Sequence, residues 1–435
     1  MRRVTFLFVL LVVSVLVVSG MVFAAEGNIN WRQFEGKTIN ATMCVHHFTD
    51  ALEKEIPQFE ALTGIKVQLS KYTEEEFYNK VTIELASGKP TFDIFMLNQG
   101  FVAQYVGGGW VAPLNGYLGD PKLTDAAWYD LKDFAPAALD KPEYEGKLYG
   151  IPISVEPQIL FYRTDLFQEK GLTAPDTVDQ MYDAAVKLRK LPDLAGIVLR
   201  LKRGTGSIWP WGGLVADYKG YWVDKKGNVG LTLPETVAAT EMYMKLLKDG
   251  GPDKAVNFGW YECLLAFQQG KTAMVADANS WEVGFQDPAK SAVAGKVGAV
   301  PLPAAVEGYR QAAGGSSWML GVSLASNNKE AAWLFTQWAT SKSIALKIAL
   351  GSGNIARSSI WTSDEFVKTY PYTDWIKASK DTIEKYISDY YLPEVVKFGA
   401  IADEMDVALE EMYGGAPVKE TLEKVQAKTV EILKK

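Results

Sequence analysis

The sequence predicts an α/β fold in two lobes, each a mainly parallel sheet flanked by helices. Strand-like and helix-like patterns alternate along the chain, and this alternation is seen once before residue 150 and again after it. The length agrees with this, because 435 residues with 48% hydrophobic and 22% charged side chains can form two cores of ordinary domain size.

In the first half, residues 38–45 are typical of a strand, and the apolar residues of 52–62 have the spacing of a helix. Alternating apolar residues in 65–69 predict a second strand. A second helical face over 77–85 and an apolar strand at 92–97 follow. The resulting order, β-α-β-α-β, favours a parallel sheet covered by helices.

Polar side chains directly follow two of these strands. His46 and His47 come after the first strand, and Asn98 and Gln99 come after the third. Ligands of parallel α/β sheets bind outside the carboxyl ends of the strands, so these four residues are candidate binding residues.

The second half repeats the pattern. Residues 151–163 have strand character, 178–188 are predicted as a helix, and a loop rich in Gly and Trp occupies 203–214. A helix and a strand are predicted next, within 261–276. Asp277 stands at the end of that strand with Trp281 just beyond, so two facing lobes would place both residues in a cleft.

An acidic residue interrupts the apolar stretch GIPISVEPQILFYRTDLF at residues 150–167. A carboxylate within such a run is unfavourable by several kcal/mol unless it is paired, hydrogen-bonded or at an opening. Proline is excluded from a central ladder, so Glu156 and Pro157 indicate that the strand surfaces there. The alternative is that Glu156 pairs with a nearby arginine such as Arg163.

The first 25 residues carry two arginines, a long uncharged stretch and a small-residue end, which is typical of a cleaved signal peptide. The alternative is an uncleaved anchor, because Val4 to Ala25 is long enough to span a membrane. No cysteine follows the apolar stretch before Cys44, which argues against a lipoprotein. The formal charge of −7, without a later basic run, argues against nucleic acid as a partner.

Cys44 and Cys263 are the only cysteines, and both lie in apolar surroundings. We expect free buried thiols rather than a disulfide, since spacing alone cannot justify a bond. His46 and His47 are the only histidines, and adjacent side chains converge poorly on one ion, so neither a metal nor a cofactor is expected.

Several segments, in this order and spacing, resemble the sugar-binding type of extracellular solute-binding protein family 1, the capture subunits of ABC importers for maltose, other oligosaccharides and polyols. They are PQFEALTGIKV (57–67), LASGKPTFDIFML (85–97), GKLYGIPISVEPQILFYRTDLF (146–167), FQQGKTAMVADANSW (267–281), and VGAVPLP with GGSSWMLGVS and NNKEAAWLFTQWATS within 297–341. The resemblance implies a non-enzymatic, monomeric binding protein of the two-lobe, type II periplasmic binding protein fold. Its lobes would close by a hinge around a carbohydrate, and its partners would be permease subunits in the membrane.

The resemblance also implies roles for individual residues. Glu156 matches a glutamate that faces the sugar, and Trp281 matches an indole that stacks on a sugar ring. Trp318 is a further stacking candidate, and Trp209 and Trp211 are weaker ones.

Three more polar residues match positions in relatives. Arg203 resembles an arginine whose guanidinium binds two ligand hydroxyls. Asp277 matches an aspartate that follows the corresponding strand in some relatives. Arg357 matches an arginine at the end of a glycine-rich turn. The alternative for each arginine is an ion pair at the surface or between the lobes. His46 and His47 depart from the usual Asn, Asp or Lys, which leaves the ligand open.

The expected division is a signal peptide at 1–25, lobe 1 at 28–150 with 312–350, and lobe 2 at 151–311 with 351–435. Two other classes stay open at this point. A glycosidase would use two carboxylic acids, for which Glu156 and Asp277 are the candidates, although no other catalytic motif is present. A surface adhesin would need the N-terminal segment to persist.

Overall fold

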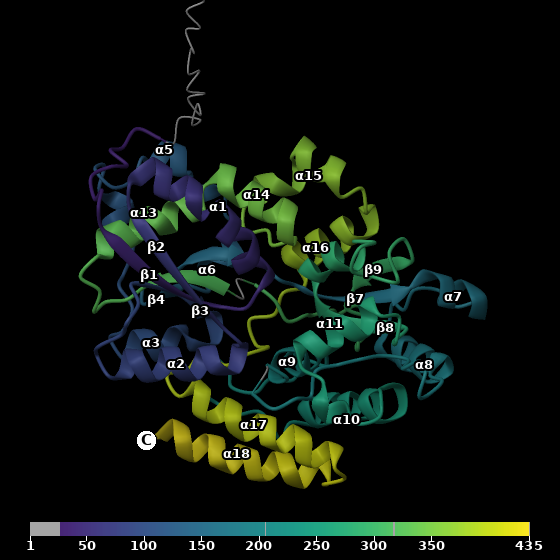
Figure 1. The fold of residues 1–435 in the computed structure, drawn as a ribbon. Coiled ribbons are helices and arrows are strands. Elements are labelled where there is room, and N and C mark those ends of the chain that lie inside the picture. The colour runs from purple at the N-terminus through teal and green to yellow at the C-terminus, as the bar shows by residue number, and fades with distance from the viewer. Residues whose placement is uncertain (1–26, 205, 316–317, 435) are drawn as a thin grey trace, which may run out of the picture.

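The computed structural model describes residues 27–204, 206–315 and 318–434, and they form two α/β lobes that lie side by side (Figure 1). Lobe 1 is built on a five-stranded sheet and lobe 2 on a three-stranded sheet. The predicted signal peptide lies outside the described residues. In the ranges that are described, no helix combines the length and the hydrophobicity that a membrane span requires.

The sheet of lobe 1 has five strands, which are β1 (Thr38–Cys44), β2 (Lys66–Tyr72), β3 (Ile94–Asn98), β6 (Ile151–Ser154) and β10 (Trp318–Val322). Their order in the sheet is β2-β1-β3-β10-β6. The first three strands are parallel, as the alternating pattern predicts, whereas β10 runs antiparallel to both of its neighbours. Strand β10 joins this sheet only after the chain has passed through lobe 2.

Helices cover both faces of this sheet and enclose its apolar core. They are α1 (His47–Thr63), α2 (Glu74–Ala86), α3 (Val102–Gly107), α4 (Asn115–Gly119), α5 (Ala126–Tyr129), α6 (Pro136–Asp140), α13 (Lys329–Ala339) and α14 (Lys342–Ser352), and a short hairpin pairs β4 (Glu143–Tyr144) with β5 (Lys147–Leu148). Helix α1 ends where Gly64 takes a left-handed conformation, with φ at 71°, which glycine adopts without strain. In the core, the ring of Phe59 in α1 contacts Phe335 and Trp338 of α13.

The sheet of lobe 2 is antiparallel, so the prediction of a mainly parallel sheet is wrong for this lobe. Strand β7 (Gln158–Arg163) lies between β8 (Met274–Ala278) and β9 (Val297–Pro301) and runs antiparallel to both. Residues Ala195 and Val198 add only isolated parallel bridges beside β8. Alternation of helix and strand therefore indicated the elements, but their pairing depends on contacts distant in sequence.

Lobe 2 also contains the last helices of the chain. Its helices are α7 (Thr164–Lys170), α8 (Val178–Leu188), α9 (Ile208–Asp217), α10 (Pro234–Lys245), α11 (Trp260–Gln268), α12 (Glu282–Phe285), α15 (Asp364–Thr369), α16 (Thr373–Lys385), α17 (Phe398–Tyr413) and α18 (Val418–Lys434). Helices α17 and α18 pack against each other and extend beneath both lobes in the view of Figure 1. They therefore reach the space between the lobes from below.

Segments that join the lobes lie against one another. The amide of Val155 donates to the carbonyl of Ile355, and the amide of Glu156 donates to that of Gly315. The first of these segments begins after β6, which the predicted boundary assigns to lobe 2 but which pairs with β10 in the sheet of lobe 1. Both cysteines are free and buried, as predicted, and they belong to different cores.

Candidate functional site

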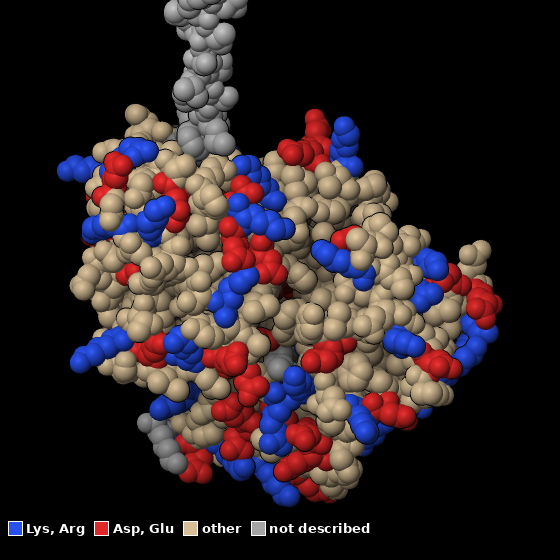
Figure 2. All heavy atoms as spheres, viewed as in Figure 1, with Lys and Arg blue, Asp and Glu red and all other residues tan. Residues whose placement is uncertain are grey.

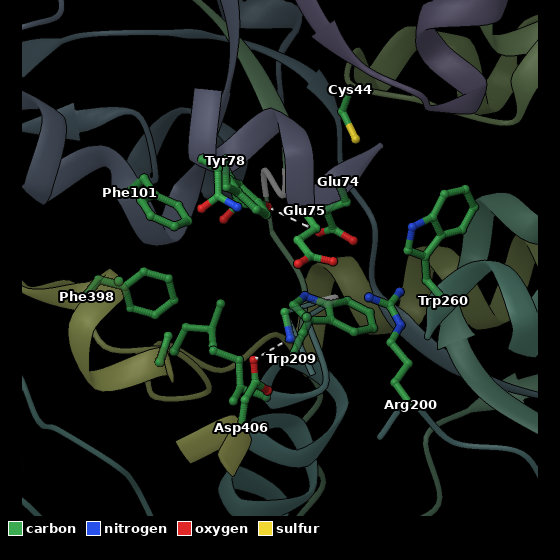
Figure 3. A pocket seen from close by; sticks show the side chains of 18 of the residues that line it. Cys44, Glu74, Glu75, Tyr78, Phe101, Arg200, Trp209, Trp260, Phe398 and Asp406 are labelled. Atoms are coloured by element: carbon green, nitrogen blue, oxygen red, sulfur yellow. Dashed lines mark hydrogen bonds between the residues drawn. The ribbon is translucent and has the colours of Figure 1, made fainter. Parts of the chain in front are cut away.

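A cavity of about 660 Å³ lies between the lobes. Lobe 1 contributes the end of β1, the helix α2 and the residues after β3. Lobe 2 contributes the residues before and at the start of α9, the end of β8, and α17 (Figure 3). A volume of this size is typical of small-molecule sites.

Glu156 lies at the junction of the lobes and is 6% exposed. Its Oε1 accepts hydrogen bonds from Asn354 Nδ2 at 2.8 Å and Ser280 Oγ at 3.2 Å, and lies 3.3 Å from His46 Nε2. Burial raises the pKa of this carboxyl, but His46 and Ser280 outweigh burial, so the pKa lies below its ordinary value. Glu156 is thus an ionised, buried acceptor that lines the cavity.

The two histidines differ in their hydrogen bonds. His46 precedes α1, and its Nδ1 accepts from the amide of Phe48, which leaves the proton on Nε2 to face Glu156. The Nε2 of His47 is buried and has no hydrogen-bond partner within the described part of the chain. Burial, with a contribution from His46, lowers the pKa of His47 to about 4, so this imidazole is neutral.

Arg200 carries the main positive charge within the cavity. Its Nε donates to Asp277 Oδ2 at 2.7 Å and its second nitrogen donates to Asp277 Oδ1, which makes a bidentate pair. The guanidinium lies 5.1 Å from the ring centre of Trp209 and 5.8 Å from that of Trp281. Burial alone would lower the pKa of Arg200, but Asp277 raises it. The group is therefore charged, held in place and faced by two indoles.

An aromatic row forms the wall on the side of lobe 1. Tyr78 stacks between Trp318, with ring centres 5.9 Å apart, and Phe101, at 4.8 Å. Phe398 of lobe 2 contacts Phe101 edge-on at 5.3 Å. These rings give the cavity apolar surface next to its charged groups, which suits a ligand with both kinds of surface.

Acidic residues line the end of the cavity beneath α2. Tyr78 donates its hydroxyl to Glu74 Oε1 at 3.3 Å, and the amide of Gly204 donates to Asp406 Oδ2 at 3.2 Å. Burial, together with Asp403 and Glu74, raises the pKa of Asp406 to about 7. Arg203 lies at the rim, where it pairs with Glu410 at 2.7 Å.

Most of the predicted site residues line this cavity. They are His46, His47, Asn98, Glu156, Arg203, Trp209, Trp281 and Trp318. Trp281 is only 3% exposed and also packs against Phe285, so it serves the core as well as the cavity wall.

Four predicted residues do not line the cavity, and one of them, Trp211, is fully buried in the core of lobe 2. Both carboxylate oxygens of Asp277 are used by Arg200, so Asp277 positions the arginine instead of facing a ligand. Gln99 is buried in the short 3-10 helix that follows Asn98 and β3. Arg357 is completely buried among backbone carbonyls of lobe 1, which explains why it cannot reach a ligand.

Sequence reasoning missed several cavity residues, among them Arg200, Glu74, Tyr78, Phe398 and Asp406. Arg200 had a usable signal, because it interrupts the apolar stretch IVLRL at 197–201 in the same way that Glu156 interrupts its own strand. Phe398 and Asp406 had none, since they reach the cavity only through the packing of α17.

The chain belongs to the bacterial extracellular solute-binding protein family, whose model matches residues 46–345. Members of this family bind solutes and are not enzymes. Asp277, the predicted partner of Glu156 in a glycosidase, is bound through both carboxylate oxygens to Arg200.

Relatives and solved structures support the assignment. The chain is 27% identical over 414 residues to the erythritol/L-threitol-binding protein of Mycolicibacterium smegmatis, covering 89% of this chain and 84% of that protein. It is 31% identical over 281 residues to the mannitol-binding protein of Pseudomonas aeruginosa, covering 63% of this chain and 62% of that protein. The structure of an ABC transporter solute-binding protein from Agrobacterium radiobacter K84 in complex with ribitol superimposes on this chain with a TM-score of 0.85 at 26% identity. The match covers 92% of this chain and 99% of that one. The predicted two-lobe α/β fold is thereby confirmed, apart from the antiparallel sheet of lobe 2.

Proposed function

We propose that this protein captures a polyol or a sugar in the cavity between its lobes and delivers it to an ABC importer. The observation that carries the proposal is the Arg200–Asp277 pair, which presents a charged fork between two indoles, in a cavity that also contains the buried acceptor Glu156. Hydroxyl groups both donate and accept, so a polyhydroxylated chain satisfies both groups at once. This ligand class is supported by the three relatives named above. Two of them are named as binding proteins for alditols, and the third was solved with ribitol bound.

The ligand contacts in this proposal come from the residues that line the cavity. Glu156, His46 and Asn98 would bind hydroxyls from the junction of the lobes, and Trp281 and Trp209 would cover carbon-bound hydrogens. The same proposal includes the division into lobe 1 at 28–150 with 312–350 and lobe 2 at 151–311 with 351–435. This division is adjusted so that β6 belongs to lobe 1. Hinge closure would bring the two sets of residues together.

A thermal-shift screen against alditols, monosaccharides and oligosaccharides tests the proposal. A ligand at a hundred times its dissociation constant adds about 2.7 kcal/mol to stability, which such a screen detects easily. Calorimetric titration of each hit should then give one site per chain. A complete absence of shifts across alditols and sugars would overturn the proposed ligand class.

Export and delivery to the importer form the remaining part of the proposal. The protein would be released by cleavage near Ala25, act as a monomer without a lipid, and dock on permease subunits of the importer. Mass determination of the protein secreted by its host tests the first step. An intact Met1 end would instead support an anchored form.

A further inference from the structure

The charged groups that line the cavity do not balance. Its acidic residues are Glu74, Glu75, Glu156, Asp403 and Asp406, and its guanidinium groups are those of Arg200 and Arg203. Both guanidinium groups already hold a carboxylate, that of Asp277 and that of Glu410. In the described part of the chain, no lysine or arginine forms an ion pair with Glu74, Glu75, Asp403 or Asp406.

One carboxylate oxygen of Asp406 is unsatisfied. The residue is 6% exposed and lines the cavity, and its Oδ1 is buried and has no hydrogen-bond partner among the residues that the structure describes. Its other oxygen accepts from the amide of Gly204. A buried carboxylate oxygen left unpartnered costs free energy, so a donor from a bound ligand would be favourable at this position.

The opposite wall adds negative charge to the same space. The side chains of Glu74 and Glu75 on α2 point across the cavity toward that of Asp406 on α17 (Figure 3). On the molecular surface, acidic side chains lie next to basic ones where α2 lies opposite α9 and α17 (Figure 2). The negative charge of the cavity wall would repel an anionic ligand, whereas a cationic ligand would be attracted to it.

We propose that the cavity prefers a polyhydroxylated ligand bearing a protonated amine, an amino polyol or amino sugar, over the neutral and carboxylated forms of the same carbon chain. The hydroxyl chain lies between Arg200 and Glu156, and the ammonium group reaches Asp406. An ammonium has three donors and no acceptor, which matches a wall of carboxylates. The inference rests on the proposed function, because it assumes that a polyol or sugar occupies this cavity.

Matched ligands test this preference by calorimetric titration at about pH 7, where an amine with a pKa of about 8 or higher is mostly protonated. The first series is D-glucitol, D-glucamine and D-gluconate, which share a carbon chain and differ in charge at C1. The second is D-glucose, D-glucosamine and D-glucuronate. We expect the amine of at least one series to bind about tenfold more tightly than its neutral parent, and the carboxylate to bind more weakly than both.

Variants identify the group that binds the amine. Asp406→Asn keeps the shape but removes the charge, so it should reduce the preference for the amine over its neutral parent at least about threefold. Glu411→Gln on the same helix is the matched control, because Glu411 is exposed and lies outside the cavity. It should leave the preference unchanged. An undiminished preference in Asp406→Asn would overturn the assignment of the ammonium to Asp406.

The failure of this inference differs from the failure of the proposed function. If neutral polyols or sugars bind but no amine binds more tightly than its parent, the amine preference is wrong and the proposed function stands. Tightest binding of a carboxylate, or no binding in either series, overturns the preference as well. If no alditol or sugar in the wider screen binds, the proposed function is wrong too.

Discussion

Two buried arginines of this protein are stabilised in different ways. Arg200 in the cavity makes a bidentate pair with Asp277 and lies against Trp209 and Trp281. Arg357, which packs against lobe 1, donates mainly to backbone carbonyls, those of Thr340 at 2.7 Å and Tyr129 at 2.8 Å. The first is surrounded by groups that a ligand can reach, and the second by the fold itself.

The surroundings move the two pKa values in opposite directions. Burial lowers the pKa of Arg357. The carboxylate of Asp133, 3.4 Å away, raises the pKa but offsets the effect of burial only in part. At Arg200, the full carboxylate of Asp277 more than compensates for the effect of burial on the pKa. A buried cation therefore indicates a binding site only when its partners and neighbours open onto a cavity.

The largest effect is expected when Arg357 is removed. Arg357→Met leaves several carbonyls without their donor and Asp133 without its counter-ion, so we expect a loss of roughly 3–5 kcal/mol in the free energy of unfolding. Urea unfolding measures this, with Arg357→Lys as a control that keeps the charge but loses the fork. A stable Arg357→Met protein with weakened ligand binding would instead place Arg357 in the site.

Removing Arg200 should affect both stability and binding. Arg200→Met leaves Asp277 buried without a counter-ion, which should destabilise the fold by about 3 kcal/mol. The double variant Arg200→Met/Asp277→Leu removes both charges and should regain most of that stability without regaining affinity. Urea unfolding and calorimetric titration separate the two effects, and wild-type affinity in the double variant would exclude Arg200 as a ligand contact.

His47 extends the comparison to a partly buried base that forms no ion pair within the described residues. Its pKa falls from 6.5 to about 4, mainly because of burial. As pH falls through this range, the unfolded chain binds a proton that the folded imidazole does not, so stability decreases by up to about 3 kcal/mol. Urea unfolding from about pH 7 to about pH 4 should show this loss in the wild type and a smaller one in His47→Phe. Equal pH dependence in both proteins would contradict the lowered pKa.

The sequence predicted the elements of the fold better than their pairing. The helix expected at 178–188 is α8 over the same residues, because its apolar face has helical spacing and Thr177 caps it. The antiparallel pairing of β7 with β8 joins residues distant in the chain, such as Gln158 and Ala278, which periodicity cannot reveal. Strand ends were informative in lobe 1, where β1 and β3 are parallel and bring His46 and Asn98 to one cavity.

The same limit applies to the predicted site residues. Asp277 lies beside the cavity, but its role depends on Arg200, which lies 77 positions earlier in the chain. Arg357 has the residue type of a ligand contact, and only its burial among carbonyls separates it from Arg200. Residue type thus predicted the chemistry, whereas burial and long-range contacts decided where it is used.

Trp209 and Trp211 offer a matched pair on one helix. Trp209 lines the cavity, whereas Trp211 is fully buried and donates its Nε1 to Thr240 Oγ1 at 3.0 Å. Trp209→Ala should weaken binding by about 2 kcal/mol, or about thirtyfold, with little change in stability. Trp211→Ala should do the reverse, losing stability by cavity formation in the core. Titration and urea unfolding of both variants check this, and unchanged affinity in Trp209→Ala would remove it from the site.

The smallest effect concerns Glu156. Glu156→Gln keeps the shape and one acceptor for Asn354 and Ser280, but it replaces charge-assisted hydrogen bonds with neutral ones. We therefore expect an affinity loss of about 1 kcal/mol, or about fivefold. Combined with Trp281→Phe, the loss should be less than the sum of the two single losses, because both side chains hold the same ligand. Titration of the wild type, both single variants and the double variant measures this coupling. Full additivity would mean that Glu156 and Trp281 contact the ligand independently, and unchanged affinity in all variants would place the ligand outside the cavity.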